Sequence, residues 1–251
     1  MRRSDRGASA LRPANVVRSG CRAFPAGLDC GVRTHRAPRL AVFASGNGSN
    51  FEALATTAAR EALGGSIVAL LCDTPGAPVL DRARRLHIEA LTLPAGRFRT
   101  RLEDERPWLA ALRERRVDVV LLAGFMRRLH ATLLDPFAGR VLNIHPSLLP
   151  AFSGLDGIAQ AWRHGVRVTG CTVHVVDGVV DAGPIVAQAP VDVRDGDTLD
   201  DLEARVHEAE HTLYPWAVRR WLSEPWSLHE RRVEFGHGDG LVLPEAEAAH
   251  G

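Results

Sequence analysis

The chain has 251 residues, of which 45% are hydrophobic and 24% are charged, and its net charge is +1 at pH 7. This composition is ordinary for a globular protein with a sizeable core, and it gives no reason to expect nucleic acid or an anionic membrane as the main partner. No apolar stretch approaches the roughly 18 residues of a membrane-spanning helix. The sequence has no lysine, which excludes a lysine nucleophile, a Schiff base and a P-loop lysine.

Residues 1–38 differ in composition from the rest of the chain, with many arginines, few acids, scattered prolines and glycines, and no lasting periodicity. They lack the apolar core of a secretory signal, although their composition is faintly similar to that of an organelle transit peptide. We expect this segment to be disordered or a non-native extension, and the folded domain to occupy residues 39–245.

From residue 39 the pattern alternates between strands and helices. Continuous apolar runs predict strands, and amphipathic runs between them predict helices. The expected strands are 40–44, 66–72, 90–93, 117–123 and 141–145, and the expected helices are 51–63, 79–86 and 101–116. This alternation predicts a Rossmann-like α/β fold, with a doubly wound, mostly parallel sheet and helices on both faces.

Beyond Pro150 the expected elements become longer. A helix is expected near residues 158–164, and a last helix at 199–213, shortly before Pro215. Between these helices, two apolar runs predict the strands 168–176 and 184–193.

The sequence SGNGSN, residues 45–50, joins the first expected strand to its helix. In a doubly wound sheet this turn lies at the carboxyl ends of the strands, where ligands bind. Glycines let the backbone approach an anion, and free N–H groups at a helix N-terminus can hold a phosphate. The motif matches neither G-x-G-x-x-G nor a Walker loop. From the residues alone, a tight capped turn and a phosphate site fit equally well.

A polar pair closes the strand 141–145, in the motif NIHPSLLP. Residues two apart on a strand face the same side, so Asn143 and His145 point together, as a structural pair or as half of an active site. Asp181 lies in a later loop beside a Gly-Pro turn. If this loop folds back over the strand, its carboxylate would favour the charged imidazole and fix the ring. Alternatively, Asp181 only shapes the turn.

Residues 207–211, HEAEH, match the H-E-x-x-H zinc motif on an expected helix. The longer metzincin motif does not follow, because Tyr214 stands where it needs glycine. Such short motifs arise easily in helices rich in His and Glu, so we expect no metal site here.

The four cysteines show no C-x-x-C spacing. Cys72 and Cys171 fall within apolar, strand-like runs, whereas Cys21 and Cys30 lie in the N-terminal segment. Buried, reduced thiols of a cytoplasmic protein are the expected state.

Five motifs occur together and in a fixed order, and in this combination the chain resembles the phosphoribosylglycinamide formyltransferase family, folate-dependent enzymes of purine biosynthesis. The motifs are SGNGSN at 45–50, LAGFMR at 122–127, NIHPSLLP at 143–150, VHVVDGVVDAGPIVAQ at 173–188 and EHTLYP at 210–215. The resemblance runs from about residue 39 to about residue 245. NIHPSLLP alone indicates only the wider formyltransferase superfamily, and SGNGSN narrows it to this family.

The resemblance implies a catalytic group made of Asn143, His145 and Asp181, supported by His174. Asn143 and protonated His145 would stabilise the formyl oxygen as an oxyanion hole does. Asp181 would keep the imidazole charged and order a water that moves the proton.

The resemblance also implies two sets of substrate contacts. The set for the phosphate and ribose of glycinamide ribonucleotide is Gly48, Ser49, Asn50 and Glu210. The set for the folate is Arg101, Met126, Arg127, Arg128, Leu129 and Asn143, with backbone of residues 176–181. Two features depart from the usual pattern: Arg128 stands where an apolar residue is usual, and Asp156 and Ile158 stand where some members carry two histidines.

The implied reaction transfers the formyl group of 10-formyltetrahydrofolate to the amino group of glycinamide ribonucleotide, without a metal, in a monomer or homodimer. One alternative is formyltetrahydrofolate deformylase, a hydrolase with the same Asn-His-Asp group, but its usual regulatory domain is larger than residues 1–38. The other is a non-catalytic nucleotide-binding module, which the retention of all three catalytic residues disfavours.

Overall fold

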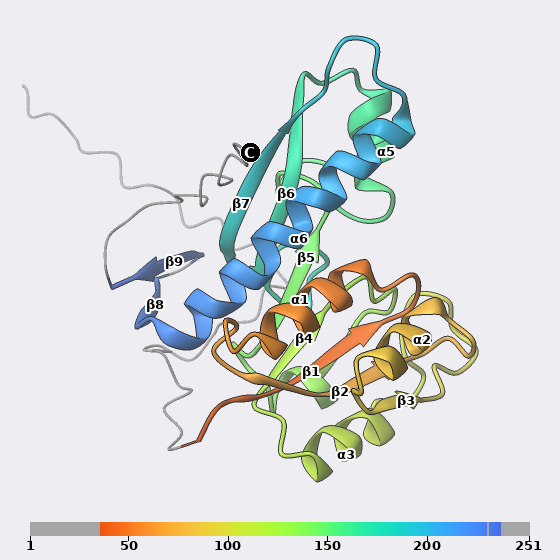
Figure 1. Ribbon diagram of the computed structural model, residues 1–251, viewed down its shortest axis with the longest axis vertical. Helices are drawn as coiled ribbons and strands as arrows, with labels where there is room; N and C mark the ends of the chain where they lie inside the picture. Colours follow the sequence, from red (N-terminus) through yellow and green to blue (C-terminus); the bar gives the residue numbers. More distant parts are fainter. Residues whose placement is uncertain (1–35, 230, 237–251) are drawn as a thin grey trace, which may run out of the picture.

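The computed structural model describes residues 36–229 and 231–236 (Figure 1). The strands in chain order are β1 Arg39–Ala44, β2 Ser66–Cys72, β3 Ala90–Thr92, β4 Val119–Leu122, β5 Val141–His145, β6 Val168–Val175, β7 Ile185–Asp192, β8 Trp226–His229 and β9 Arg232–Phe235. The helices are α1 Ser49–Ala59, α2 Pro78–Arg85, α3 Arg106–Glu114, α4 Ala131–Leu134, α5 Gly157–Arg163 and α6 Leu199–Ser223.

The described strands form a nine-stranded sheet in the order β3-β2-β1-β4-β5-β6-β7-β9-β8. The first five in this order are parallel to one another. From β1 the chain continues to β2 on one side, and β4 lies on the other, so the turn after β1 sits at a topological switch point. There the amide of Ser45 donates to the carbonyl of Gly124 at 3.1 Å. The predicted doubly wound, mostly parallel sheet is confirmed.

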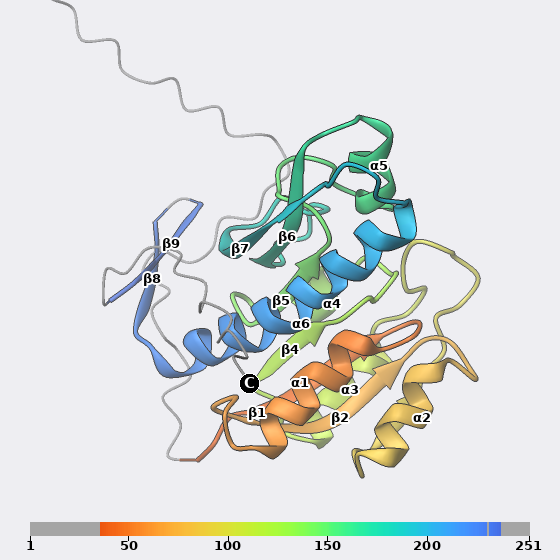
Figure 2. The same ribbon diagram turned by 45° about the horizontal axis from the view of Figure 1, so that its top comes forward.

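The other half of the sheet is mainly antiparallel. β6 runs antiparallel to β5, and β7 antiparallel to β6. The register pairs Asn143 with His174 and His145 with Thr172. Figures 1 and 2 show β6 and β7 extending beyond the parallel strands, with α5 near their far end. This register places the polar residues Thr172 and His174 of β6 beside the end of β5.

Helices cover both faces of the sheet, as predicted. Alternate residues of β1 therefore pack into two separate hydrophobic cores, one on each face. Leu40 and Val42 belong to the core under α1, α2 and α6. Ala41 and Phe43 belong to the core under α3 and α4. In the second core, the ring of Phe43 lies 5.1 Å from that of Trp108, which is fully buried. Burying one such large side chain contributes about 1.5–3 kcal/mol, so two covered faces hold the strands in register.

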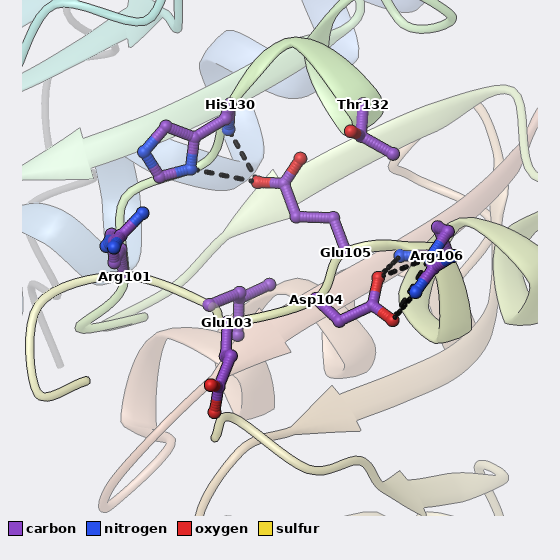
Figure 3. A pocket seen from close by; sticks show the side chains of 8 residues that line it. Arg101, Glu103, Asp104, Glu105, Arg106, His130 and Thr132 are labelled. Carbon is purple, nitrogen blue, oxygen red and sulfur yellow. Dashed lines mark hydrogen bonds and ion pairs between the residues drawn. The ribbon is translucent and has the colours of Figure 1, made fainter. Parts of the chain in front are cut away.

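The helix expected at 101–116 begins only at Arg106. Pro107 occupies the first turn, where its missing N–H costs nothing. Residues 101–105 form a connecting segment instead, and Glu105 is buried where it accepts the amides of His130 and Leu133 at 2.6 and 3.1 Å. The expected helix start was wrong because residues 101–105 look like the charged face of a helix, whereas Glu105 is buried and binds backbone amides (Figure 3).

The helix expected to end at residue 213 continues to Ser223, with Pro215 inside it. Ala217, Val218 and Trp221 are fully buried on the continuing helix face. Packing of this face therefore outweighs the hydrogen bond that the proline cannot make. α4 and the β8–β9 hairpin were not predicted.

The described cysteines are free and buried, as expected. Burial raises the pKa of both the Cys72 and the Cys171 thiol, which keeps them unreactive. Cys21, Cys30 and almost all of the segment 1–38 lie outside the described residues. Among the helices of the described chain, none has the length and apolarity to cross a bilayer.

Candidate active site

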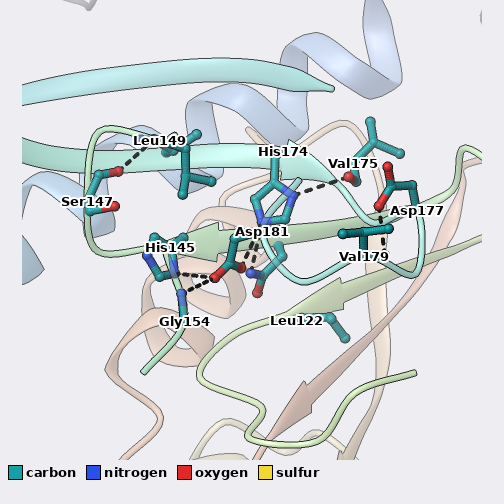
Figure 4. A network of polar contacts seen from close by, with 12 residues as sticks. Leu122, His145, Ser147, Leu149, Gly154, His174, Val175, Asp177, Val179 and Asp181 are labelled. Atoms are coloured by element: carbon teal, nitrogen blue, oxygen red, sulfur yellow. Dashed lines mark hydrogen bonds and ion pairs between the residues drawn. The ribbon is translucent and has the colours of Figure 1, made fainter. Parts of the chain in front are cut away.

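The loop between β6 and β7 folds back over the end of β5. It brings Asp181 to His145 and His174 (Figure 4). Oδ2 of Asp181 lies 3.4 Å from Nδ1 of His145, and Oδ1 lies 3.6 Å from Nε2 of His174. Asn143 joins the group because the strand register sets it opposite His174. The four residues expected to form one group are therefore adjacent, and the Asp181 carboxylate faces both histidine rings.

His145 has an acceptor beside each of its ring nitrogens. Its Nε2 lies 2.9 Å from the carbonyl oxygen of Phe152, and its Nδ1 faces the Asp181 carboxylate. A carbonyl and a carboxylate accept hydrogen bonds and donate none, so both contacts are favourable only when both nitrogens carry a proton. The side chain is 6% exposed, which shields the pair from solvent. Each ring nitrogen of His145 thus has an oxygen acceptor in place before any ligand binds.

His174 holds the amide of Asn143. The amide nitrogen of Asn143 lies 3.1 Å from Nε2 of His174, and Nδ1 of the same ring lies 3.2 Å from the carbonyl of Val175. The amide nitrogen of Asn143 can only donate, so Nε2 of His174 is the acceptor of that contact. One N–H of the Asn143 amide is used in this way, and the second is left for a ligand.

Asp181 is held in its ionised form by several contacts. Burial acts to raise its pKa, but the neighbouring His174 ring, the charge of His145 and the Gly154 amide together outweigh burial and lower the pKa. The Gly154 amide donates to Oδ2 at 2.7 Å. Asp181 itself has a left-handed backbone, with φ of 49°. This uncommon conformation turns the carboxylate inward.

The loop SGNGSN leads directly into α1. Gly48 has φ of 81°, and a Cβ there would lie 2.3 Å from a methyl carbon of Val79. Only glycine fits, which explains its place in the motif. No side chain caps α1, so amides of its first turn are open to an anion. Ser49 and Asn50 are half-buried at this helix end. The geometry suits a phosphate.

Glu210 connects this helix end to α6. It is 3% exposed, and its Oε2 accepts from Nδ2 of Asn50 and from Nδ1 of His207, each at 2.9 Å. The hydrogen bond with Glu210 raises the pKa of His207. Burial lowers the pKa of His211. Within the described residues, no three His, Cys, Asp or Glu side chains are placed to hold a metal ion. The H-E-x-x-H residues thus contribute a carboxylate beside the Asn50 amide.

The residues expected to contact folate occupy three different settings. Arg127 is bound within the protein, to the Asp73 carboxylate at 2.6 Å and the Phe98 carbonyl at 2.5 Å. Leu129 is 5% exposed and packs in the core. The exposed members are Arg101, Met126 and Arg128. The folate contacts stay a prediction.

Sequence reasoning missed the partners that residues 152–154 supply. The Phe152 carbonyl and the Gly154 amide contact His145 and Asp181, respectively. Backbone groups have no sequence signature, and this pairing forms only after the two loops meet. Gly154 has φ of 87°, and a glycine within an expected loop was the one available signal.

The chain matches the family model described as formyl transferase over residues 38–218. It is 44% identical over 184 residues to the phosphoribosylglycinamide formyltransferase of Bacillus subtilis (strain 168), covering 73% of this chain and 94% of that protein. The crystal structure of glycinamide ribonucleotide transformylase 1 from Symbiobacterium toebii superposes with a TM-score of 0.76 at 39% identity, over 80% of this chain and 95% of that one.

A formyltetrahydrofolate deformylase from Pseudomonas syringae also superposes, with a TM-score of 0.71 over 80% of this chain and 66% of that one. Its sequence identity is 23%, so this likeness shows a shared fold and no more. The resemblance drawn from the five motifs is confirmed by the much higher identity to the Bacillus protein. With a model match across most of its length, the chain belongs to the formyl transferase family.

Proposed function

We propose that the protein is an enzyme that transfers the formyl group of 10-formyltetrahydrofolate to the amino group of glycinamide ribonucleotide. The observation that carries this proposal is the meeting of His145, Asp181 and Asn143 at the carboxyl edge of the sheet. Edges of this kind are where ligands bind in doubly wound folds. The names of the Bacillus and Symbiobacterium relatives support the choice of substrates.

The ribonucleotide phosphate binds at the N-terminus of α1. Gly48, Ser49 and Asn50 supply backbone N–H groups that α1 leaves uncapped, and the helix dipole favours a negative charge there. Glu210 accepts from Asn50 and His207 through Oε2, so Oε1 is left for a ribose hydroxyl. In this arrangement the substrate amino group is proposed to lie near the end of β5.

In the chemical step, the amine nitrogen attacks the formyl carbon, and negative charge develops on the formyl oxygen. Asn143 donates its second amide N–H to this oxygen. His145 is the second proposed donor to this oxygen. Donors fixed before the reaction need no reorganisation as the charge develops, which is the source of oxyanion-hole catalysis. The bond from the formyl carbon to N10 then breaks.

One proton must travel from the attacking amine to the leaving N10. Asp181 acts as the positioned base because its lowered pKa keeps it ionised at neutral pH. It passes the proton directly or through one water, and His145 stays charged throughout. No covalent enzyme intermediate forms.

The folded catalytic domain is proposed to begin near residue 39 and to be independent of the preceding segment. The substrates are small molecules, and the reaction needs no metal.

An assay of purified protein with both substrates tests the function. Formyl transfer to the ribonucleotide is the expected result. A parallel reaction without the ribonucleotide measures hydrolysis of the formyl donor, and hydrolysis at the rate of transfer would favour the deformylase alternative. No reaction in either would favour a non-catalytic module.

A further inference from the structure

One arginine of α2 holds the loop that leads into α1. The two helices lie beside one another on the same face of the sheet (Figures 1 and 2). The guanidinium of Arg82 donates from Nε to the main-chain carbonyl of Asn47 at 2.8 Å, and from Nη2 to Oδ1 of the same residue at 2.7 Å. Its Nη1 pairs with the Glu52 carboxylate on α1. All three nitrogens of the guanidinium are therefore bound to the SGNGSN loop or to the first turn of α1.

The start of α2 fixes the same loop at its two glycines. The amide of Val79 donates to the carbonyl of Gly46 at 3.1 Å. The Val79 side chain also fills the space that a Cβ on Gly48 would need. Between these two points the loop is held at Asn47 by Arg82, whose side chain is only 23% exposed. The shape of the loop thus depends on α2.

Asn47 stands where its own side chain would compete with an anion. Asparagine side chains commonly accept a hydrogen bond from the backbone N–H two residues further along the chain. For Asn47 this N–H belongs to Ser49, one of the amides proposed to hold the phosphate. Arg82 binds the Oδ1 of Asn47 instead. The uncapped amides of α1 are thereby kept open for a ligand.

Arg82 also balances a negative charge at this end of α1. Glu52 is the acidic residue of the first helical turn. Without a partner, its carboxylate would repel a phosphate bound at the same helix end. Arg82 pairs with it directly, and Arg85 lies 3.5 Å from its other oxygen. The partial positive charge of the helix N-terminus is then available to the ligand.

Resting on the proposed function, we propose that Arg82 is a positioning residue for the ribonucleotide phosphate. It acts through Asn47, which it holds away from the open amides, and through Glu52, which it neutralises. The phosphate takes no part in bond making, so its contacts stabilise ground state and transition state alike and act on KM. The formyl donor is proposed to bind at other residues, so its KM should not depend on Arg82.

The experiment measures kcat and the KM of each substrate for Arg82→Gln. KM for the ribonucleotide should rise by roughly two- to thirtyfold, the range for charge effects at a helix N-terminus. Both kcat and KM for the formyl donor should stay near the wild-type values. Arg82→Lys keeps the charge beside Glu52 but loses the forked contact with Asn47, so its KM should lie between the two. Glu52→Gln combined with Arg82→Gln should recover part of the loss, since no carboxylate then opposes the phosphate.

The matched control is Arg84→Gln on the same helix. Arg84 is exposed and forms an ion pair with Asp81 at 2.7 Å, so the control also removes one arginine and breaks one ion pair. It should leave kcat and both KM values unchanged.

The outcomes separate the role of Arg82 from the proposed function. Wild-type protein that transfers formyl groups, with an unchanged KM for the ribonucleotide in Arg82→Gln, would overturn the role of Arg82 alone. The same holds for a loss confined to kcat, for an equal rise in both KM values, and for an equal rise in Arg84→Gln. If Arg82→Gln does not fold, Arg82→Lys gives the same test, and a wild-type KM overturns the proposal. Absence of transfer by the wild type would instead overturn the proposed function.

Discussion

Oδ2 of Asp181 lies 3.4 Å from Nδ1 of His145, and the same oxygen accepts the Gly154 amide at 2.7 Å. The contact links the loop after β6 to the end of β5 and to the loop that follows it. A carboxylate shared in this way fixes the orientation of the imidazole. The proposed catalysis depends on this one pair of side chains.

Asp181→Asn should lower kcat by roughly two to four orders of magnitude, the usual range for a positioned acid–base group. The amide keeps the shape of the side chain but cannot accept the proton or balance the charge of His145. KM for both substrates should change much less, because the lost interaction strengthens mainly in the transition state. Steady-state kinetics with each substrate varied in turn measures both effects.

The control for this variant is Asp177→Asn in the same loop. Asp177 is buried and its Oδ1 accepts the Val179 amide at 3.0 Å, a contact that asparagine can also make. Its turnover should stay near that of the wild type. Equal losses in the two variants would mean that Asp181 acts only on loop shape.

The pH dependence of stability should carry the signature of Asp181. Its pKa is lower in the folded protein than the ordinary value of 3.8. The unfolded chain therefore takes up the proton first as the pH falls, so the stabilisation is fully present above about pH 5 and is lost as the pH falls through the folded value. Urea unfolding of wild type and Asp181→Asn should give a constant difference in free energy from pH 6 to pH 5 and a smaller one at pH 3. A difference that grows towards pH 3 would contradict this sign.

Glu210→Ala should raise KM for the ribonucleotide, because Glu210 accepts hydrogen bonds from Asn50 and His207 at the proposed ribose site. Glu208→Ala is the matched control, since Glu208 is exposed on the same helix and should have little effect. Elemental analysis should find no bound zinc. Stoichiometric zinc, with activity lost to a chelator and restored by metal, would give Glu210 a different role.

Much of the fold could be predicted because the inner strands are apolar throughout. β4 is buried at every position, as expected for a central strand of a parallel sheet with both faces covered. The ends of α3 and α6 could not be predicted, since tertiary packing decided them. Glu105 is buried to hold α4, and Pro215 stays in its helix because of the apolar residues around it. A local pattern contains neither fact.

The candidate site was only half accessible from the sequence. Asn143 and His145 share a strand face by simple alternation, and this could be read from the motif. The contact with Asp181 depends on the antiparallel pairing of β6 and on a left-handed residue, which is a long-range outcome. Its identification rested on the family resemblance.

Removing residues 2–35 should leave melting temperature and turnover nearly unchanged. Chain ends tolerate loss unless they are tied down, and the first described contacts are those of Arg36 with Asp118 at 2.9 and 3.1 Å. The shortened protein keeps Arg36 and thus this ion pair. A large fall in the melting temperature of the shortened protein would show that the deleted residues pack on the domain.

Tyr214→Phe should destabilise the fold without removing a catalytic contact. The Tyr214 hydroxyl is fully buried and lies 3.1 Å from the carbonyl of Leu122, at the end of β4, and 3.1 Å from that of Leu142 on β5. Burial raises the pKa of this hydroxyl, so it stays protonated and donates to one carbonyl at a time.

Phenylalanine fills the same space but leaves these buried carbonyls short of a donor, which costs about 1–3 kcal/mol. Urea unfolding should show that loss with an unchanged m-value, because the native and unfolded states keep their compactness. Thr212→Ala, at an exposed position of the same helix, should change stability by less than about 0.5 kcal/mol. A free energy of unfolding for Tyr214→Phe that equals that of Thr212→Ala would mean that the two carbonyls need no hydroxyl. The kcat of Tyr214→Phe should change by less than tenfold, since the Tyr214 hydroxyl contacts main-chain carbonyls of Leu122 and Leu142 and no side chain of the proposed catalytic group.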